Sequence, residues 1–214
     1  MTPRINICKV CFKDFDTIYE NNSICDKCFN KFVAVYKHFK LDDVMGLVIY
    51  EYNDFFKSQL YQLKGCGDIE LSSIFLERQK SIIKLKYFGY YVITMPSWHE
   101  DDEKRQFKHL IEIIKPLNLQ VIDCLKKKIK FKQSTLNKKE REKVTNKFEI
   151  INGYQITNKK ILIFDDVMTT GSSLKAAIYH IKKFKPKKIK ILVLARNCRK
   201  IKKYVERKIT NDEE

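Results

Sequence analysis

A strand, two acidic residues, a hydroxyl-rich loop and a helix follow one another within residues 161–184, and this order constrains the fold more than any other feature of the chain. The apolar run 161–164 predicts a buried strand, and the apolar spacing over 174–184 predicts a helix. Asp165, Asp166 and a Thr-Thr-Gly-Ser-Ser loop stand between the two. Together they predict a strand–loop–helix unit of a parallel sheet, with its polar groups at the carboxyl end of the strand.

This loop has the chemistry of a sugar-phosphate site. Backbone N–H groups at the N-terminus of a helix point toward an anion, and the helix dipole favours the anion's charge. Gly171 lets the backbone approach a phosphate closely, and the carboxylates of Asp165 and Asp166 can accept hydrogen bonds from ribose hydroxyls. The predicted ribose- and phosphate-binding residues are Asp165, Asp166, Val167, Met168, Thr169, Thr170, Gly171, Ser172 and Ser173. The alternative is an ordinary capped turn of a parallel sheet without a ligand.

The run 161–173 resembles the signature with which type I phosphoribosyltransferases bind phosphoribosyl pyrophosphate (PRPP), in which two acidic residues precede a short phosphate loop. The resemblance implies that Asp165 and Asp166 are the catalytic candidates if the chain is an enzyme. Such an enzyme displaces pyrophosphate from the anomeric carbon of PRPP, and Mg2+ neutralises the leaving group. The polar segment 126–149 then stands where this fold carries a flap that excludes water.

Four cysteines near the start of the chain, Cys8, Cys11, Cys25 and Cys28, form two Cys-x-x-Cys pairs. Each pair brings two thiolates together, and two pairs make a tetrahedral four-sulfur metal site. The segment is short and polar, so a metal ion would supply much of its folding free energy. Structural Zn2+ is the expected ion, with a rubredoxin-like iron centre and a redox-active cysteine pair as alternatives. The apolar spacing over 29–39 predicts a linker helix after this module.

The rest of the chain alternates strand and helix patterns. Strands are expected over 47–52, 90–96, 119–125, 161–164 and 189–195, and helices over 54–63, 69–85, 107–117 and 174–184. This alternation predicts a parallel sheet with right-handed crossovers, flanking helices and a ligand at the carboxyl ends of the strands. The predicted fold class is α/β, of the type I phosphoribosyltransferase kind, preceded by a small zinc-binding module. The predicted division is 1–38 for the zinc module with its linker helix and 39–214 for the larger domain.

The charge of the chain favours polyanionic partners. Its 214 residues include 43 Lys and Arg against 26 Asp and Glu, which gives a net charge of +17. The candidates for contact with nucleic acid are Lys126, Lys127, Lys128, Lys187, Lys188 and Lys190, and a solvated lysine-rich surface is the alternative. The chain opens with polar and charged residues and has no long apolar span, so we expect a cytoplasmic protein that does not insert into a membrane.

The cysteine module and the larger domain together resemble the ComF family of competence proteins, which join a four-cysteine zinc module to a type I phosphoribosyltransferase-like domain. The resemblance rests on the two cysteine pairs and on the runs 63–65, 94–96, 105–107, 133–148 and 161–173. It implies binding of PRPP or a related ribose phosphate with Mg2+. It also implies a role in natural transformation, in which the protein handles incoming single-stranded DNA, with proteins of the DNA-uptake machinery as candidate partners.

One loop departs from the family pattern. After Pro96 the loop carries the acidic residues 100–103, in the region where a phosphoribosyltransferase holds the pyrophosphate of PRPP. Ser97, Lys104 and Arg105 are the candidates for this contact, and Mg2+ would have to stand between the pyrophosphate and the carboxylates. Two functions therefore stay open. One is a ribose-phosphate-binding protein that handles DNA. The other is an active phosphoribosyltransferase with an unknown nucleobase or small-molecule acceptor and no DNA role.

Overall fold

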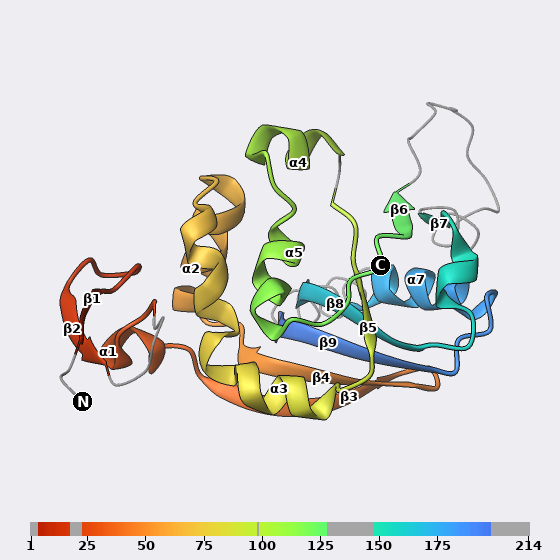
Figure 1. The fold of residues 1–214 in the computed structure, drawn as a ribbon, viewed down its shortest axis with the longest axis horizontal. Helices are drawn as coiled ribbons and strands as arrows, with labels where there is room; N and C mark the ends of the chain where they lie inside the picture. Colours follow the sequence, from red (N-terminus) through yellow and green to blue (C-terminus); the bar gives the residue numbers. More distant parts are fainter. Residues whose placement is uncertain (1–3, 18–22, 98, 128–147, 198–214) are drawn as a thin grey trace, which may run out of the picture.

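The computed structural model describes residues 4–17, 23–97, 99–127 and 148–197, and the fold given below is theirs. A five-stranded sheet crosses the molecule in the order β3-β4-β9-β8-β5 (Figure 1). Its strands are β3 (Ala34–Leu41), β4 (Val44–Glu51), β5 (Tyr91–Thr94), β8 (Lys160–Met168) and β9 (Lys188–Arg196). β4, β9, β8 and β5 run parallel, and β3 pairs antiparallel with β4. The predicted α/β fold with a parallel sheet is confirmed.

Short helices and 3-10 turns flank this sheet. The helices are α2 (Asp54–Gly65), α3 (Lys80–Lys86), α4 (His99–Arg105), α5 (His109–Ile114) and α7 (Ser172–Lys182). The 3-10 turns are η1 (Ile69–Phe75), η2 (Glu77–Gln79), η3 (Lys115–Leu117) and η4 (Gly153–Ile156). Asn53 caps α2, because its side chain accepts a hydrogen bond from Phe56 N at 2.8 Å. No helix in the described part of the chain is long and apolar enough to cross a bilayer.

β8 carries the acidic pair and lies inside the sheet. Residues 161–164 are fully buried, and β8 pairs with β5 on one side and β9 on the other. A parallel strand that is covered on both faces needs a continuous apolar run, which is the pattern that the sequence has here. Phe164 is in register with Thr94 of β5 and Leu192 of β9. The carboxyl ends of these strands therefore share one edge of the sheet, called the carboxyl edge below.

The predicted linker helix over 29–39 is wrong. Only one helical turn, α1 (Asp26–Phe29), forms, and β3 begins at Ala34. The apolar spacing of this stretch suits a helix, but its valines and aromatic residues also suit a strand, and β3 pairs with β4 over most of its length. Pairing with a neighbouring strand therefore outweighs the local pattern.

Two further segments differ from the prediction. The acidic loop after Pro96 forms helix α4, whose acidic first turn and basic last turn both complement the helix dipole. The expected strand over 119–125 is reduced to one bridge between Val121 and Val92. β6 (Leu125–Lys127) pairs instead with β7 (Phe148–Ile150) in a separate antiparallel pair. Residues 128–147, which include most of the predicted flap, lie outside the described residues.

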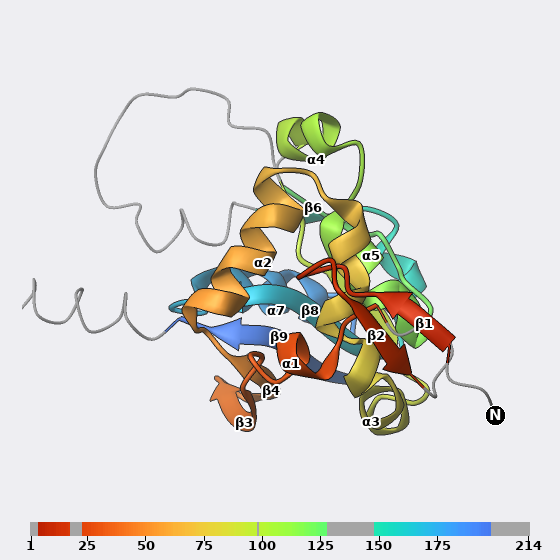
Figure 2. The same cartoon turned by 90° about the vertical axis from the view of Figure 1, so that its left-hand side faces the viewer.

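The cysteine module packs directly on the larger domain. β1 (Arg4–Ile7) and β2 (Asp14–Thr17) form a hairpin at one end of the molecule, and Figure 2 looks onto this end. Ser23 N donates to Glu77 Oε1 at 2.7 Å, and the hydroxyls of Ser73 and Ser23 lie 3.0 Å apart. Glu77 and Ser73 belong to the stretch 69–85, for which one helix was predicted, and the structure divides this stretch into η1, η2 and α3.

An aromatic cluster joins the two parts. The ring of Phe32 lies 5.0 Å from that of Phe55 and 5.7 Å from that of Phe75, measured between centroids. Cys8 and Cys28 belong to the same buried core as the strands of the sheet. The domain boundary at residue 38 stays a prediction. β3, which begins before that boundary, already pairs with the sheet of the larger domain.

Candidate functional site

The acidic pair lies near the end of β8, and the phosphate loop joins the strand to α7. Gly171 is the N-cap of α7 and has φ 78°, a left-handed conformation that favours glycine. A Cβ atom at this position would also lie 3.0 Å from Leu41 Cδ2. The hydroxyls of Thr170 and Ser172 are 2.8 Å apart. The strand, loop and helix therefore follow one another as predicted, and the helix begins at Ser172, slightly earlier than expected.

A cavity of about 210 Å³ opens at the carboxyl edge, beside the acidic pair. The residues predicted from sequence that line it are Ser97, Arg105, Asp165, Asp166 and Ser173. Other polar residues that line it are Lys64, Asp101, His109 and Lys127. Side chains from six separate elements thus meet at one place, including α2, α4 and α5, which lie far from β8 in the sequence.

Asp166 is the most tightly held residue of this cavity. Its Oδ2 atom lies 2.7 Å from Lys64 Nζ and 2.9 Å from His109 Nε2. Its Oδ1 atom accepts a hydrogen bond from Val167 N at 2.6 Å. Asp166 and His109 are both buried, at 6% and 3% exposure. A buried carboxylate needs such partners, because an unpaired charge away from water is strongly unfavourable.

The two acids differ in their tendency to ionise. Burial and the neighbouring Asp166 carboxylate raise the pKa of Asp165. Burial alone would also raise the pKa of Asp166, but the hydrogen bond from His109 and the charge of Lys64 hold that pKa well below its usual range. Asp166 is therefore the ionised member of the pair, and Asp165 keeps a proton more readily.

The predicted pyrophosphate contacts are only partly gathered at the cavity. Ser97 and Arg105 line it, and Lys104 is exposed and does not. The guanidinium of Arg105 is held by its own helix, since Nη2 donates to Asp102 Oδ1 at 2.7 Å. Nη1 donates to the backbone oxygen of Lys64 at 3.4 Å. Arg105 therefore ties α4 to the end of α2 beside the acidic pair.

The middle of the predicted loop does not line the cavity. Val167 and Met168 continue β8, and neither they nor the residues Thr169, Thr170, Gly171 and Ser172 are part of the cavity lining.

Lys64 and His109 were not assigned to the site from sequence. They precede Asp166 by 102 and 57 residues, a separation that no local pattern reveals. The one available signal for Lys64 was the Leu-Lys-Gly run over 63–65.

The predicted nucleic-acid lysines occupy opposite edges of the sheet. Lys187, Lys188 and Lys190 lie where β9 begins, at the edge where β8 also begins; we call this the amino edge. Lys126 and Lys127 lie in β6 on the cavity side, where Lys126 Nζ is 2.6 Å from Asp123 Oδ2 and Lys127 lines the cavity. Lys128 lies outside the described residues.

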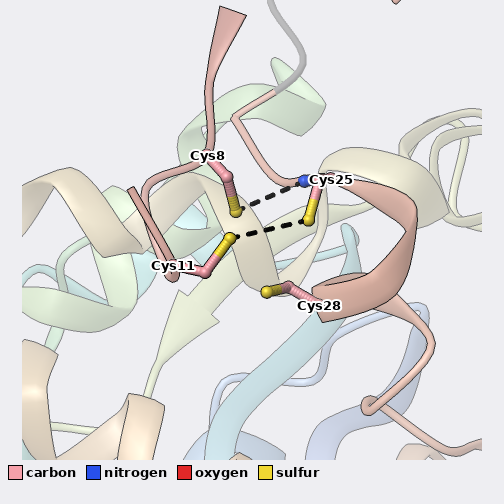
Figure 3. A group of neighbouring side chains, drawn as sticks. All are labelled: Cys8, Cys11, Cys25 and Cys28. Atoms are coloured by element: carbon pink, nitrogen blue, oxygen red, sulfur yellow. Dashed lines mark hydrogen bonds between the residues drawn. The ribbon is translucent and has the colours of Figure 1, made fainter. Parts of the chain in front are cut away.

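The four cysteines gather at one point of the amino-terminal module (Figure 3). Their sulfur atoms all lie within 4.8 Å of one another, and Cys11 Sγ is 3.9 Å from Cys25 Sγ. Sulfur atoms bound to one tetrahedral Zn2+ would be about 3.8 Å apart, so the arrangement fits this ion. Burial and the neighbouring thiols raise the pKa of Cys28, whereas at Cys8 the effect of burial is outweighed by backbone hydrogen bonds, which lower its pKa to about 7.

Comparison with known proteins gives a family match and a similar competence protein. The model of the phosphoribosyl transferase domain family matches residues 112–212. The competence protein ComFC of Streptococcus pneumoniae (strain ATCC BAA-255 / R6) is 27% identical over 148 residues, which are 69% of this chain and 66% of that protein. This chain thus spans slightly less than two thirds of the length of that relative.

Solved structures of phosphoribosyltransferases align with part of the chain. A hypoxanthine phosphoribosyltransferase from Staphylococcus aureus is 19% identical, covering 57% of this chain and 61% of that one, with a TM-score of 0.39. A purine phosphoribosyltransferase from Pyrococcus horikoshii Ot3 is 19% identical, covering 57% and 73%, with a TM-score of 0.37. The family match, the competence relative and the cysteine cluster agree with one another: the chain resembles the ComF competence proteins, with a four-cysteine module ahead of a phosphoribosyl transferase domain.

Proposed function

We propose that the cavity at the carboxyl edge binds PRPP or a related ribose phosphate together with Mg2+. The observation that carries this proposal is the meeting of the acidic pair and the start of α7 at one cavity. The N–H groups at the start of α7 would hold the 5-phosphate, and Gly171 leaves room for it. An acid of the pair would accept hydrogen bonds from the ribose hydroxyls. Lys127 and Arg105 offer positive charge to the pyrophosphate, and the carboxylate of Asp101 is an oxygen ligand of the kind that Mg2+ prefers.

The experiment is titration calorimetry with PRPP in the presence of Mg2+. We expect saturable binding that weakens when Mg2+ is withdrawn, and weaker binding of ribose 5-phosphate, which lacks the pyrophosphate. A protein that gives no heat with PRPP and Mg2+, and whose thermal midpoint they do not change, would contradict the proposal.

Turnover is a second step of the same proposal. A transferase would form a bond from an acceptor atom to the anomeric carbon and break the bond from that carbon to pyrophosphate. Turnover would need Mg2+ to neutralise the leaving pyrophosphate, because the first turn of α4 is acidic and Asp102 engages the guanidinium of Arg105. Release of pyrophosphate on mixing the protein with PRPP, Mg2+ and a set of nucleobases would favour the active transferase with an unknown acceptor.

We infer that the four cysteines hold one structural Zn2+ in the amino-terminal module. Their spacing and the closeness of their sulfur atoms support this assignment. The ion would stabilise a module whose own apolar core is small.

A role in natural transformation, with single-stranded DNA as the polyanionic partner, is proposed from the competence relative and from the charge. The specific observation is a set of lysines at the amino edge that have no acidic partner among the described residues. We call this set the amino-edge lysines: Lys159, Lys160, Lys185, Lys187, Lys188 and Lys190. Within the described part of the chain no acidic side chain forms an ion pair with any of them. Lys175 and Lys182 of α7, in contrast, pair with Asp42 and Asp43.

Aromatic rings accompany these lysines. Lys159 Nζ lies 4.2 Å from the centroid of the Tyr91 ring, and Lys160 Nζ lies 5.9 Å from that of Tyr90. Proteins that bind single strands without sequence preference combine such a cationic surface with aromatic faces on which bases stack. DNA handling of this kind would take place in the cytoplasm, where proteins of the DNA-uptake machinery are candidate partners.

Matched variants test the DNA surface. Lys187→Gln with Lys188→Gln removes two unpaired charges, and Lys175→Gln with Lys182→Gln removes two paired ones. We expect only the first pair to weaken binding of a labelled oligothymidylate and to reduce the log–log salt slope, by about 1.4 for two phosphate contacts. Equal effects of the two pairs would mean that net charge alone matters. No binding at any salt concentration would favour the small-molecule enzyme without a DNA role.

A further inference from the structure

The two acids of the pair make very different contacts, although they are neighbours in the sequence. Asp166 accepts hydrogen bonds through both carboxylate oxygens. Lys64 Nζ and His109 Nε2 contact its Oδ2, and Val167 N donates to its Oδ1 at 2.6 Å. Its side chain is only 9% exposed. A carboxylate offers about four lone-pair positions, and three of these are occupied in Asp166.

Asp165 has one carboxylate oxygen that accepts no hydrogen bond from the described residues. Its Oδ1 atom accepts the backbone N–H of Asp166 at 3.0 Å. Its Oδ2 atom receives no hydrogen bond from the described residues, and the side chain, which is half-buried, lines the cavity. An incoming hydroxyl group can therefore reach Asp165 Oδ2 without displacing a donor of the described residues.

The donors to Asp166 are fixed from other parts of the fold. His109 comes from α5 and is 3% exposed, and its Nδ1 is buried without a partner in the described residues. An ionised Asp166 can only accept, so it requires the tautomer of His109 in which Nε2 is the donor. Lys64 is near the end of α2, and its backbone oxygen accepts a hydrogen bond from Arg105. Displacing both donors from Asp166 would leave a buried imidazole and an ammonium group unpaired. The free-energy cost of these two lost contacts exceeds the gain from one hydrogen bond to a ribose hydroxyl.

We propose that the acidic pair divides its roles: Lys64 and His109 are positioning residues that hold Asp166 as a fixed anion, and Asp165 is the carboxylate that contacts the ribose hydroxyls. This inference rests on the proposed ribose-phosphate function and deepens it. The sequence signature assigns both acids to the ribose, so the division is a property of this chain's own contacts.

The first experiment compares Asp165→Asn with Asp166→Asn, which have nearly the same shape as the acids that they replace. We expect Asp165→Asn to weaken PRPP binding at least tenfold without lowering the thermal midpoint of the ligand-free protein. Asp166→Asn should lower that midpoint by several degrees without any ligand, because Lys64 and His109 lose their shared anion.

The second experiment tests the positioning role of His109. His109→Gln keeps an N–H donor that can reach Asp166, and His109→Leu does not. We expect the Gln variant to retain the thermal midpoint and the PRPP affinity and the Leu variant to lose both. The double variant Asp166→Asn, His109→Leu should lose less stability than the sum of the two single variants, because the residues act through one contact.

Three outcomes would overturn the proposal. One is an equal loss of PRPP affinity in the two Asn variants with no change of midpoint in either, which would make both acids ribose ligands. Another is strict additivity of Asp166→Asn and His109→Leu. The third is a wild-type protein that does not bind PRPP, which removes the role of Asp165 together with the proposed function. In that last case the stability measurements still decide whether Lys64 and His109 hold Asp166.

Discussion

At the scale of single residues, Asp165 gives the protein a dependence on pH. Its pKa is raised above the ordinary value of 3.8, so the folded protein holds this proton more tightly than the unfolded chain does. The resulting stabilisation is fully present below the unfolded-state pKa and is lost as the pH rises through the folded-state pKa. We expect the thermal midpoint of the ligand-free protein to fall across this window. Asp165→Asn, which cannot ionise, should remove that part of the fall.

Scanning calorimetry at pH values from roughly 5 to 9 measures the difference in thermal midpoint between Asp165→Asn and the wild type. Asp166→Asn is the control of opposite sign. The lowered pKa of Asp166 contributes stability above its unfolded-state pKa, and this stability is lost only in acid. A difference between Asp165→Asn and the wild type that does not vary with pH would show that Asp165 titrates normally.

A second prediction at the residue scale concerns the backbone conformation of Gly171. Both Gly171 and Gly67 have positive φ, 78° and 76°, but only Gly171 has a neighbour that an added Cβ would meet, at Leu41. Gly67→Ala therefore reports the backbone strain alone, of roughly 1 kcal/mol, and Gly171→Ala adds the contact with Leu41. We expect the larger loss of midpoint, and a loss of PRPP affinity, at Gly171 only. Equal effects of the two variants on PRPP binding would place the phosphate away from this loop.

At the scale of elements, the sequence patterns correctly predicted the strands and helices that depend on local interactions. β8, the loop and α7 were predictable because a continuous apolar run, a glycine turn and helical spacing occur within 24 residues, 161–184. The linker helix failed because β3 gains its stability by pairing with β4, which the spacing of its own apolar residues does not reveal. Lys64 and His109 could not be assigned for the same reason, since their common partner Asp166 lies far along the chain.

The cysteine module supplies the prediction at this scale. If the cysteines hold the proposed Zn2+, treatment with a strong chelator should increase amide hydrogen exchange in residues 4–17 and 23–33, because the four ligands come from these two segments. β3 should stay protected, since its hydrogen bonds are made with β4. Cys11→Ser should lose the ion, and Cys66→Ser, at an exposed cysteine outside the cluster, should keep one zinc per chain by elemental analysis. Loss of protection throughout the sheet would show that the two parts unfold together.

At the scale of the whole molecule, the two proposed binding regions lie at opposite edges of one sheet. β8 starts beside the amino-edge lysines and carries the acidic pair toward its other end, and the rise of five residues from Lys160 to Asp165 is about 16 Å. That separation exceeds the screening length of about 8 Å at physiological salt. The charge of a bound ribose phosphate should therefore be felt only weakly at the amino edge. The lysines of β6, in contrast, lie beside the cavity itself.

Simultaneous binding tests which edge carries the DNA. If single-stranded DNA lies along the amino-edge lysines, saturating PRPP with Mg2+ should change its dissociation constant by less than about twofold, because no contact is shared and the charges are screened. Fluorescence anisotropy of a labelled oligothymidylate, with and without PRPP at equal free Mg2+, measures this directly, since Mg2+ itself competes for phosphates. Competition of tenfold or more would mean that the strand crosses the cavity, and Lys127→Gln should then weaken both ligands. If PRPP instead tightened DNA binding, ligand binding at one edge of the sheet would be coupled to the affinity of the other edge.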